Sequence, residues 1–317
     1  MAHDYSAVST HLVRTELWSD QLKEVLQDML QGQRLVNWMS NFPDGTTFTI
    51  PSIGEMVIRN VSESDDVVYD AMDTGEFQMT INHYVESATY ITDKAQQDAY
   101  YSAQLISSFV PKMRRALEEN LETKILAMGN DQTVDDLNTI NGGDHRFVAS
   151  GATNTVLALA DFAKAKYALD KANASAARVA IIDPSQEYVL NTLTGLSDVT
   201  YNPKFEGIVN SGFVNQATGL RFSKSVYGFD VYVSNYLPTP VDSTINSISV
   251  PSSPVTNIFC SLGGDETPFK GVWRQMPRVE HERNKDKRRD EYVMNSRYGL
   301  KLYRPECLVT ILSKSTI

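Results

Sequence analysis

Cysteine is scarce in this sequence, whose 317 residues contain only Cys260 and Cys307. Two cysteines cannot form a disulfide framework, and this usage is typical of a protein that folds in a reducing compartment. Free cysteines are most often simply buried, so we expect two structural thiols.

Long apolar runs are also absent. No stretch approaches the roughly 20 apolar residues that a membrane span requires. Residues 1–5, Met-Ala-His-Asp-Tyr, lack the basic region and apolar run of a secretory signal. The sequence therefore predicts a protein that is made and used in solution, with no membrane partner.

Catalytic and metal-binding motifs are missing as well. The five histidines do not show the i, i+4 spacing of a helical zinc site, and no Cys-x-x-Cys pair is present. Phosphate-binding loops, dinucleotide fingerprints and the Gly-x-Ser-x-Gly string are absent too. We therefore expect no enzyme, no cofactor and no metal. His145, beside Asp144 and Arg146, is the candidate general base for the enzyme alternative, although the turn residues near it favour a surface-loop histidine.

Basic residues are rare in the first third of the chain. Residues 1–93 carry 4 Lys and Arg against 15 Asp and Glu, whereas the remainder carries 25 against 24. No lysine occurs between Lys23 and Lys94. An acidic segment of this kind argues against a surface dedicated to nucleic acid or anionic lipid there.

What the acidic segment does contain is a strand pattern over residues 46–91. Phe77, Met79, Ile81, His83 and Val85 recur at every second position, which predicts an extended strand. A two-stranded ribbon is marginal alone in water and needs a partner surface, either the body of its own chain or another copy. The second possibility predicts a protein that assembles with itself.

Helical patterns surround this ribbon. Residues 12–31 show an amphipathic stripe, and residues 92 or 93 begin a long helix that we expect to kink or restart at Pro111 before it ends near residue 128. Residues 155–174 and 186–193 predict two further helices, and the predicted strands cover residues 179–182, 228–234, 258–262, 273–282, 290–297, 298–303 and 308–312. This alternation indicates an α/β or α+β protein.

Three strings connect these elements to a known family. They are Leu-Ala-Met-Gly-Asn at 126–130, Gly-Phe-Asp-Val-Tyr-Val-Ser-Asn-Tyr-Leu-Pro at 228–238, and Tyr-Gly-Leu-Lys-Leu-Tyr-Arg-Pro-Glu at 298–306. In this order, after an acidic hairpin and a long helix, the chain resembles the major capsid proteins of tailed bacteriophages, whose HK-ninety-seven fold encapsulins share.

The resemblance implies an α+β fold with five parts. They are an N-terminal arm (1–40), an extended β-hairpin called the E-loop (41–91), a peripheral domain with a long spine helix (92–150), an axial α/β domain (151–262) and a return to the peripheral domain (263–317). It also implies pentamers and hexamers in an icosahedral shell around non-specifically held double-stranded DNA, with scaffolding and portal proteins as partners. The virion is the implied location, and the host bacterial cytoplasm the implied site of assembly.

The E-loop, which is the acidic arm of the sequence, departs from the family pattern in one respect. Some relatives link subunits covalently through an E-loop lysine that forms an isopeptide bond with an asparagine, and here the E-loop has no lysine. Packing, electrostatics or a separate cement protein must then stabilise the shell. An encapsulin-like compartment subunit, and more remotely an α/β enzyme, remain alternatives.

Charge suggests which segments of neighbouring copies meet. The hypothesis is that the acidic arm, meaning the acidic residues of the E-loop, lies against the basic run of another copy. The simpler alternative is that each segment is a solvated turn. A further alternative is that the basic run faces packaged DNA, although the acidic residues within it weaken that interpretation. The candidate contact residues are Glu63, Asp65, Asp66, Asp70, Asp73, Glu76, Arg283, Lys285, Lys287, Arg288 and Arg289.

Overall fold

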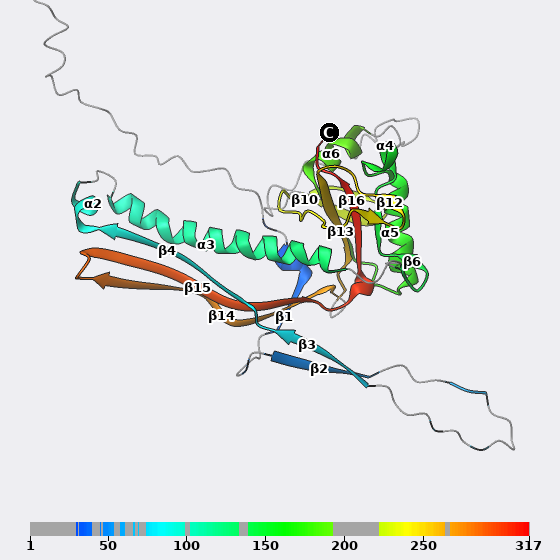
Figure 1. The fold of residues 1–317 in the computed structure, drawn as a ribbon, viewed down its shortest axis with the longest axis horizontal. Coiled ribbons are helices and arrows are strands. Elements are labelled where there is room, and N and C mark those ends of the chain that lie inside the picture. Colours follow the sequence, from blue (N-terminus) through cyan, green and yellow to red (C-terminus); the bar gives the residue numbers. More distant parts are fainter. Residues whose placement is uncertain are drawn as a thin grey trace, which may run out of the picture.

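The computed structural model describes residues 30, 32–39, 45, 47–53, 58–60, 66, 69, 74–98, 102–132, 139–192, 222–263 and 267–316. Figure 1 shows an elongated part, built from one long helix on a sheet of long strands, beside a more compact part with shorter helices. The predicted helix at residues 12–31 lies outside the described residues, apart from residue 30. No helix in the described ranges is long and apolar enough to cross a membrane.

The elongated part rests on a four-stranded sheet. In spatial order its strands are β1 (Val36–Met39), β14 (Phe269–Asn284), β15 (Arg289–Leu302) and β4 (His83–Thr92). β1 runs parallel to β14, whereas β14, β15 and β4 are antiparallel neighbours. The strands predicted at 290–297 and 298–303 are one continuous strand, which pairs with β14 from Arg289 to Leu302, whereas its pairing with β4 ends at Tyr298.

The long helix covers one face of this sheet (Figure 1). Burial alternates strictly along most of β4, and Val85 on its inner face packs with Met113 and Leu117 of α3 (Ser102–Ala127). A short helix, α2 (Asp93–Asp98), precedes α3, and the Thr92 hydroxyl accepts a hydrogen bond from the Ala95 amide at 3.3 Å, which confirms the predicted cap.

Of the kink or restart predicted at Pro111, the restart is wrong. α3 continues through Pro111 as one helix of 26 residues, which at 1.5 Å per residue is about 39 Å long. Proline removes one backbone donor, whereas the buried Met113 and Leu117 beyond it pack on Met294 of the sheet and keep the helix in contact there. α3 ends at the 3₁₀ turn η2 (Met128–Asp131), close to the predicted position.

The compact part is built on a six-stranded sheet. In spatial order its strands are β7 (Arg146–Val148), β16 (Leu308–Lys314), β13 (Pro254–Ser261), β8 (Arg178–Ile182), β10 (Phe229–Val233) and β9 (Phe222–Val226). Helices α5 (Leu159–Lys171) and α6 (Pro184–Thr192) pack on one face. Phe162, Phe229 and Phe259 meet edge to face in this core, with ring centroids 5.1 to 6.4 Å apart.

The opposite face of the six-stranded sheet packs on the elongated part. Ile258 and Leu308 share a buried cluster with Ile125 and Leu126 at the end of α3 and with Tyr298 of β15. The two sheets therefore share one apolar core. The six-stranded sheet includes β7, which precedes residue 151, and the C-terminal strand β16. The division of the chain into five parts remains a prediction.

The helix predicted at residues 155–174 begins later than expected. Ala158 is extended (φ −110°, ψ 162°), and α5 starts at Leu159 because the Asp161 carboxylate accepts hydrogen bonds from the Ala158 and Ser150 amides. Before it, α4 (Gly151–Asn154) contains left-handed residues, and Gly151 pairs with Val156.

Three two-stranded sheets complete the described part. They are β2 (Thr47–Ile53) with β3 (Thr74–Thr80), β5 (Thr139–Ile140) with β6 (Gly143–Asp144), and β11 (Thr244–Ile245) with β12 (Ile248–Ser249). The predicted ribbon is thus divided: β2 and β3 pair with each other, whereas β4 pairs with β15 of its own chain. A further 3₁₀ turn, η4 (Pro305–Cys307), leads into β16.

Candidate intersubunit surfaces

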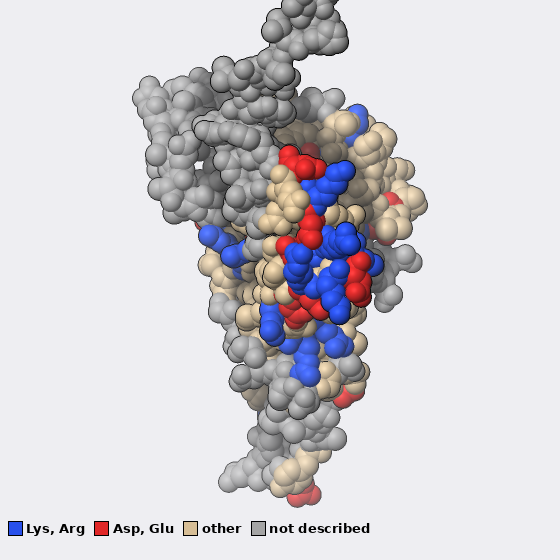
Figure 2. Space-filling view, turned by 90° about the vertical axis from the view of Figure 1, so that its left-hand side faces the viewer, with Lys and Arg blue, Asp and Glu red and all other residues tan. Residues whose placement is uncertain are grey.

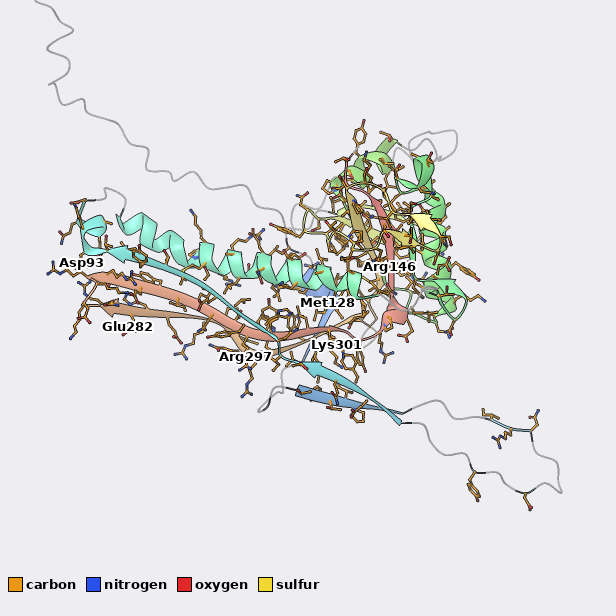
Figure 3. All side chains as sticks on the ribbon, viewed as in Figure 1. Asp93, Met128, Arg146, Glu282, Arg297 and Lys301 are labelled. Atoms are coloured by element: carbon orange, nitrogen blue, oxygen red, sulfur yellow. The ribbon has the colours of Figure 1, made fainter. Side chains whose placement is uncertain are left out.

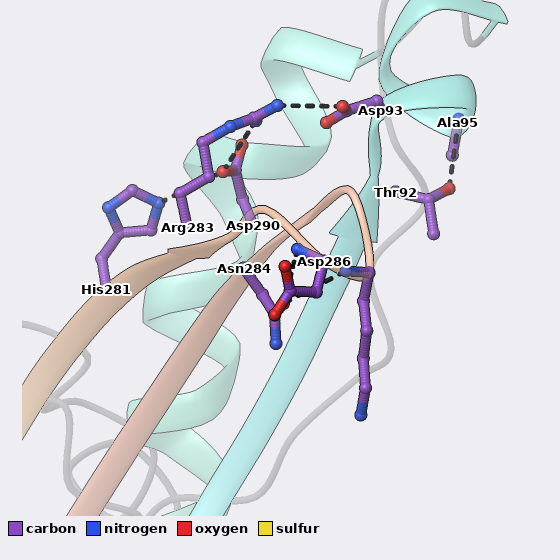
Figure 4. A network of polar contacts seen from close by, with 9 residues as sticks. Thr92, Asp93, Ala95, His281, Arg283, Asn284, Asp286 and Asp290 are labelled. Carbon is purple, nitrogen blue, oxygen red and sulfur yellow. Dashed lines mark hydrogen bonds and ion pairs between the residues drawn. The ribbon is translucent and has the colours of Figure 1, made fainter.

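The basic run forms the tip of the β14–β15 hairpin, called here the basic tip (residues 283–289). Arg283 lies near the end of β14 and Arg289 begins β15, so only the residues between them form the turn. The Asn284 side chain closes that turn, since its Oδ1 accepts hydrogen bonds from the Asp286 and Lys287 amides at 3.2 and 3.1 Å (Figure 4).

Arg283 ties the tip to the start of α2. Its guanidinium contacts Asp93 at 2.9 Å and Asp290 at 3.3 Å (Figure 4), and these carboxylates raise the pKa of Arg283. The Asp93 amide also donates to the Arg288 carbonyl at 3.0 Å. Arg283 therefore forms its ion pairs within its own chain.

Arg289 also forms its contacts within its own chain. Its Nε lies 2.6 Å from Glu291 Oε1, and its guanidinium lies 4.4 Å from the centre of the Tyr90 ring. The hydrogen bond from Arg289 lowers the pKa of Glu291. Two of the five predicted basic contacts are thus paired inside the subunit.

Three exposed cations at the tip take part in no ion pair among the described residues. Lys285, Lys287 and Arg288 are exposed, and none of the ion pairs found among the described residues includes them. Figure 2 looks at this end of the molecule and shows Lys and Arg side chains gathered there with Asp and Glu between them. The positive charges available to a neighbouring copy are therefore those of Lys285, Lys287 and Arg288.

Of the predicted acidic contacts, the structure describes Asp66 and Glu76. Both are exposed, and Glu76 accepts a hydrogen bond from the Gln78 side chain at 2.7 Å. Glu63, Asp65, Asp70 and Asp73 lie outside the described residues. The β2–β3 ribbon that carries Glu76 projects away from the basic tip, which lies at the other end of the sheet (Figure 1). Pairing between the two would therefore require a second copy.

The base of the arm packs on its own subunit. Met79 and Phe77 of β3 form a cluster with Val272 of β14. The Lys301 ammonium donates to the Gln78 carbonyl at 2.7 Å and lies 4.8 Å from the centre of the Phe77 ring. For this half of the ribbon, the partner surface is the chain's own body.

Gly299 allows the arm to cross β15 closely. A Cβ atom at this position would lie 2.8 Å from the Thr80 carbonyl oxygen, a separation that real Cβ atoms do not adopt. Figure 3 shows Lys301 beside the point where β3 passes the sheet. Sequence reasoning missed both residues, because a lysine and a glycine inside a strand pattern carry no signal for a contact with a distant segment.

His145 is not on a surface loop, contrary to the expectation. It is 1% exposed, and neither ring nitrogen has a hydrogen-bond partner among the described residues. Burial lowers its pKa from 6.5 to about 4, with Asp144 acting weakly in the opposite direction. A histidine enclosed in this way lies out of reach of a substrate, so it does not support the enzyme alternative.

The cysteines are buried free thiols, as expected, and burial raises the pKa of Cys260 to about 12. Within the described ranges, no group of three or more His, Cys, Asp or Glu side chains is arranged to hold a metal ion. The described part of the surface thus consists of exposed strands, charged side chains and the projecting β2–β3 ribbon.

Comparisons with known proteins agree with this architecture. The family model described as phage capsid protein matches residues 76–311, whereas no curated protein matches the chain. Among solved structures, the capsid of the cyanophage P-SCSP1u is 16% identical with a TM-score of 0.73, and it covers 98% of this chain and 95% of that one.

Two further structures show the same fold. That of Mycobacterium phage Che8 is 17% identical with a TM-score of 0.65, covering 95% of this chain and 97% of its own. That of the cyanophage Pam1 capsid is 13% identical with a TM-score of 0.64, covering 96% and 100%. The implied capsid fold is confirmed, and since the family model matches most of its length, the chain belongs to the phage capsid protein family.

Proposed function

We propose that copies of this chain assemble without covalent links into the icosahedral head shell of a tailed phage, as pentamers and hexamers. The observation that carries the proposal is the family match over residues 76–311, together with a fold shared over nearly the whole chain with phage capsids. The role is structural rather than catalytic. Self-association into a closed shell places the same surface of each copy in repeated contacts.

The arm supports assembly without crosslinks. It projects from the subunit (Figure 1), and the absence of lysine between Lys23 and Lys94 leaves no amine in this segment for an isopeptide bond. Packing and charge between copies then stabilise the shell, with a cement protein as an additional source. Scaffolding protein, one portal vertex and packaged double-stranded DNA are the further partners we propose, with assembly in the host bacterial cytoplasm.

Electron microscopy of the purified chain tests this function directly, with size-exclusion chromatography and light scattering alongside. Closed icosahedral shells, or rings of five and six that convert to shells, are the expected result, and nucleic acid rather than cargo protein is the expected content of particles from infected cells. A stable monomer or dimer at high concentration, with scaffold and portal supplied, would contradict it.

We infer that the exposed cations of the basic tip meet the acidic arm of a neighbouring copy. Lys285, Lys287 and Arg288 have no ion-pair partner in the described part of their own chain, and Asp66 and Glu76 are exposed on the arm. Individual surface ion pairs contribute little, but opposite charges on two surfaces accelerate their encounter. The effect should therefore be seen in the rate of assembly.

Reversing both lysines tests the pairing. In Lys285→Glu with Lys287→Glu, assembly at low ionic strength is expected to slow by about tenfold, and its sensitivity to salt should diminish. Arg288 is left unchanged because its left-handed backbone (φ 48°) belongs to the turn. Light scattering over a range of salt concentrations measures both effects.

The matched control is Lys112→Glu with Lys166→Glu. Both lysines are exposed and lie on α3 and α5, away from the tip, and the total charge change is the same. The control is expected to assemble at nearly the rate of the unmodified protein. Equal slowing in the two variants would attribute the effect to net charge and remove the pairing between tip and arm.

A further inference from the structure

A buried carboxylate on the long helix binds the backbone of a segment 90 positions earlier. Glu122 lies in α3 and is 0% exposed. The Gly32 amide donates to both of its oxygens, at 2.8 Å to Oε1 and 2.7 Å to Oε2. Both carboxyl oxygens therefore contact the same backbone amide, which links Gly32 directly to the long helix.

The space around Gly32 is closed on the side of the helix. A Cβ atom there would lie 2.8 Å from Glu122 Oε2 and 3.1 Å from Ile125 Cγ2. Only glycine therefore allows the backbone amide to approach the carboxylate this closely without a shift of its neighbours.

The residues after Gly32 also pack against the long helix and the four-stranded sheet. Gly32 begins the 3₁₀ turn η1 (Gly32–Leu35), whose Leu35 is 1% exposed and packs in the cluster that contains Leu121 and Ile125. The next residue, Val36, pairs with Phe269 at the start of β1. The chain is thus bound at Gly32 by Glu122, then by apolar packing, then by the sheet.

We propose that Glu122 is the anchoring residue of η1: it fixes the point on α3 at which residues 32–35, and with them the start of β1, are held. The amide that it binds belongs to the first residue of η1, so loss of the contact should loosen residues 32–35 first and leave the two cores intact. The anchor belongs to a single chain and is independent of shell formation.

Limited proteolysis reports on this contact locally. Arg34 is exposed within η1, so trypsin can cut the bond between Arg34 and Leu35 once this turn opens. Cleavage of such a site follows the population of the locally opened state. In Glu122→Leu, which removes both acceptor oxygens, we expect cleavage after Arg34 to accelerate by about tenfold or more, measured by mass spectrometry of the newly formed N-terminus.

Global stability separates anchoring from a general structural role. Removing the carboxylate leaves the Gly32 amide without its acceptor, and local opening of residues 32–35 returns that amide to water without unfolding the rest of the subunit. We therefore expect the denaturation midpoint of Glu122→Leu to stay near that of the unmodified protein while cleavage after Arg34 rises. Glu122→Gln, which keeps one acceptor oxygen, should lie between the two.

Two further variants complete the test. Gly32→Ala perturbs the contact from the other side and should accelerate the same cleavage, even if Glu122→Leu fails to fold. Glu118→Gln removes a partly exposed carboxylate one turn earlier on α3, paired with Arg114 at 2.8 Å, and should leave the cleavage unchanged. Unchanged cleavage in both Glu122→Leu and Gly32→Ala, or a rise that only follows a fall in global stability, would overturn the anchor.

Discussion

Replacing Asp242 by alanine is expected to lower the free energy of unfolding by about 3 kcal/mol. Asp242 forms an ion pair with Nη2 of Arg146, a side chain that is 1% exposed. The Nε of Arg146 has no hydrogen-bond partner among the described residues. The Gly129 carbonyl accepts from Nη1 only at 3.4 Å. Removing the carboxylate would leave a buried charge uncompensated, and the partial exposure of Asp242, at 34% of its side chain, keeps the loss toward the lower end of the range for buried pairs.

Chemical denaturation of the subunit, monitored by circular dichroism, measures this loss. Asp230→Ala is the matched control, because Asp230 is exposed on β10 and a surface substitution should change stability by about 0.5 kcal/mol or less. In the background Arg146→Met, Asp242→Ala should cost far less, since no charge remains to be compensated. An equal cost in both backgrounds would show that the pair does not act as described.

Arg146 connects β7 to the end of the long helix. Its side chain reaches η2 at the end of α3 from β7, while Asp242 lies in the chain before β11 (Figure 3 labels Arg146 beside Met128). Asn130 of η2 adds to this joint, donating to the Thr239 carbonyl at 2.9 Å and accepting from Thr256 Oγ1 at 2.7 Å. The orientation of the long helix relative to the six-stranded sheet thus depends on polar contacts as well as on apolar packing.

His145 is expected to make the subunit acid-sensitive. Its pKa is about 4 in the folded state against 6.5 ordinarily, so as pH falls the unfolded chain takes up this proton first. Stability is therefore complete above about pH 6.5 and is lost progressively as pH falls toward 4, by up to about 3 kcal/mol. Unfolding free energies measured at intervals between pH 7 and 4 would show this loss.

His145→Leu should flatten that part of the profile, because leucine does not titrate and no hydrogen bond of the ring is lost among the described contacts. The control is His281→Leu, since His281 is about half exposed, with Nε2 3.9 Å from Asp290. The control should keep the acid dependence of the unmodified protein. A profile in His145→Leu that falls as steeply as before would contradict the assignment.

Much of the architecture follows from local patterns in the chain. The alternation from Phe77 to Val85 predicted extended structure, although the chain forms two strands there, β3 and β4, instead of one. The strands β8, β10, β13 and β16 lie close to their predicted positions. Thr92 caps the helix start as its side chain and position indicated. These features depend on side-chain period and local hydrogen bonding, which are properties of short stretches of sequence.

Contacts between distant segments required the folded chain. The burial of His145, the pairing of Arg146 with Asp242 and the contact of Glu122 with Gly32 join residues that no local pattern connects. The helix also continues through Pro111 instead of restarting there, and the apolar residues after the proline pack on the sheet. Local sequence specifies which elements form, whereas a buried polar group receives its partner only when packing brings two remote segments together and excludes water from both.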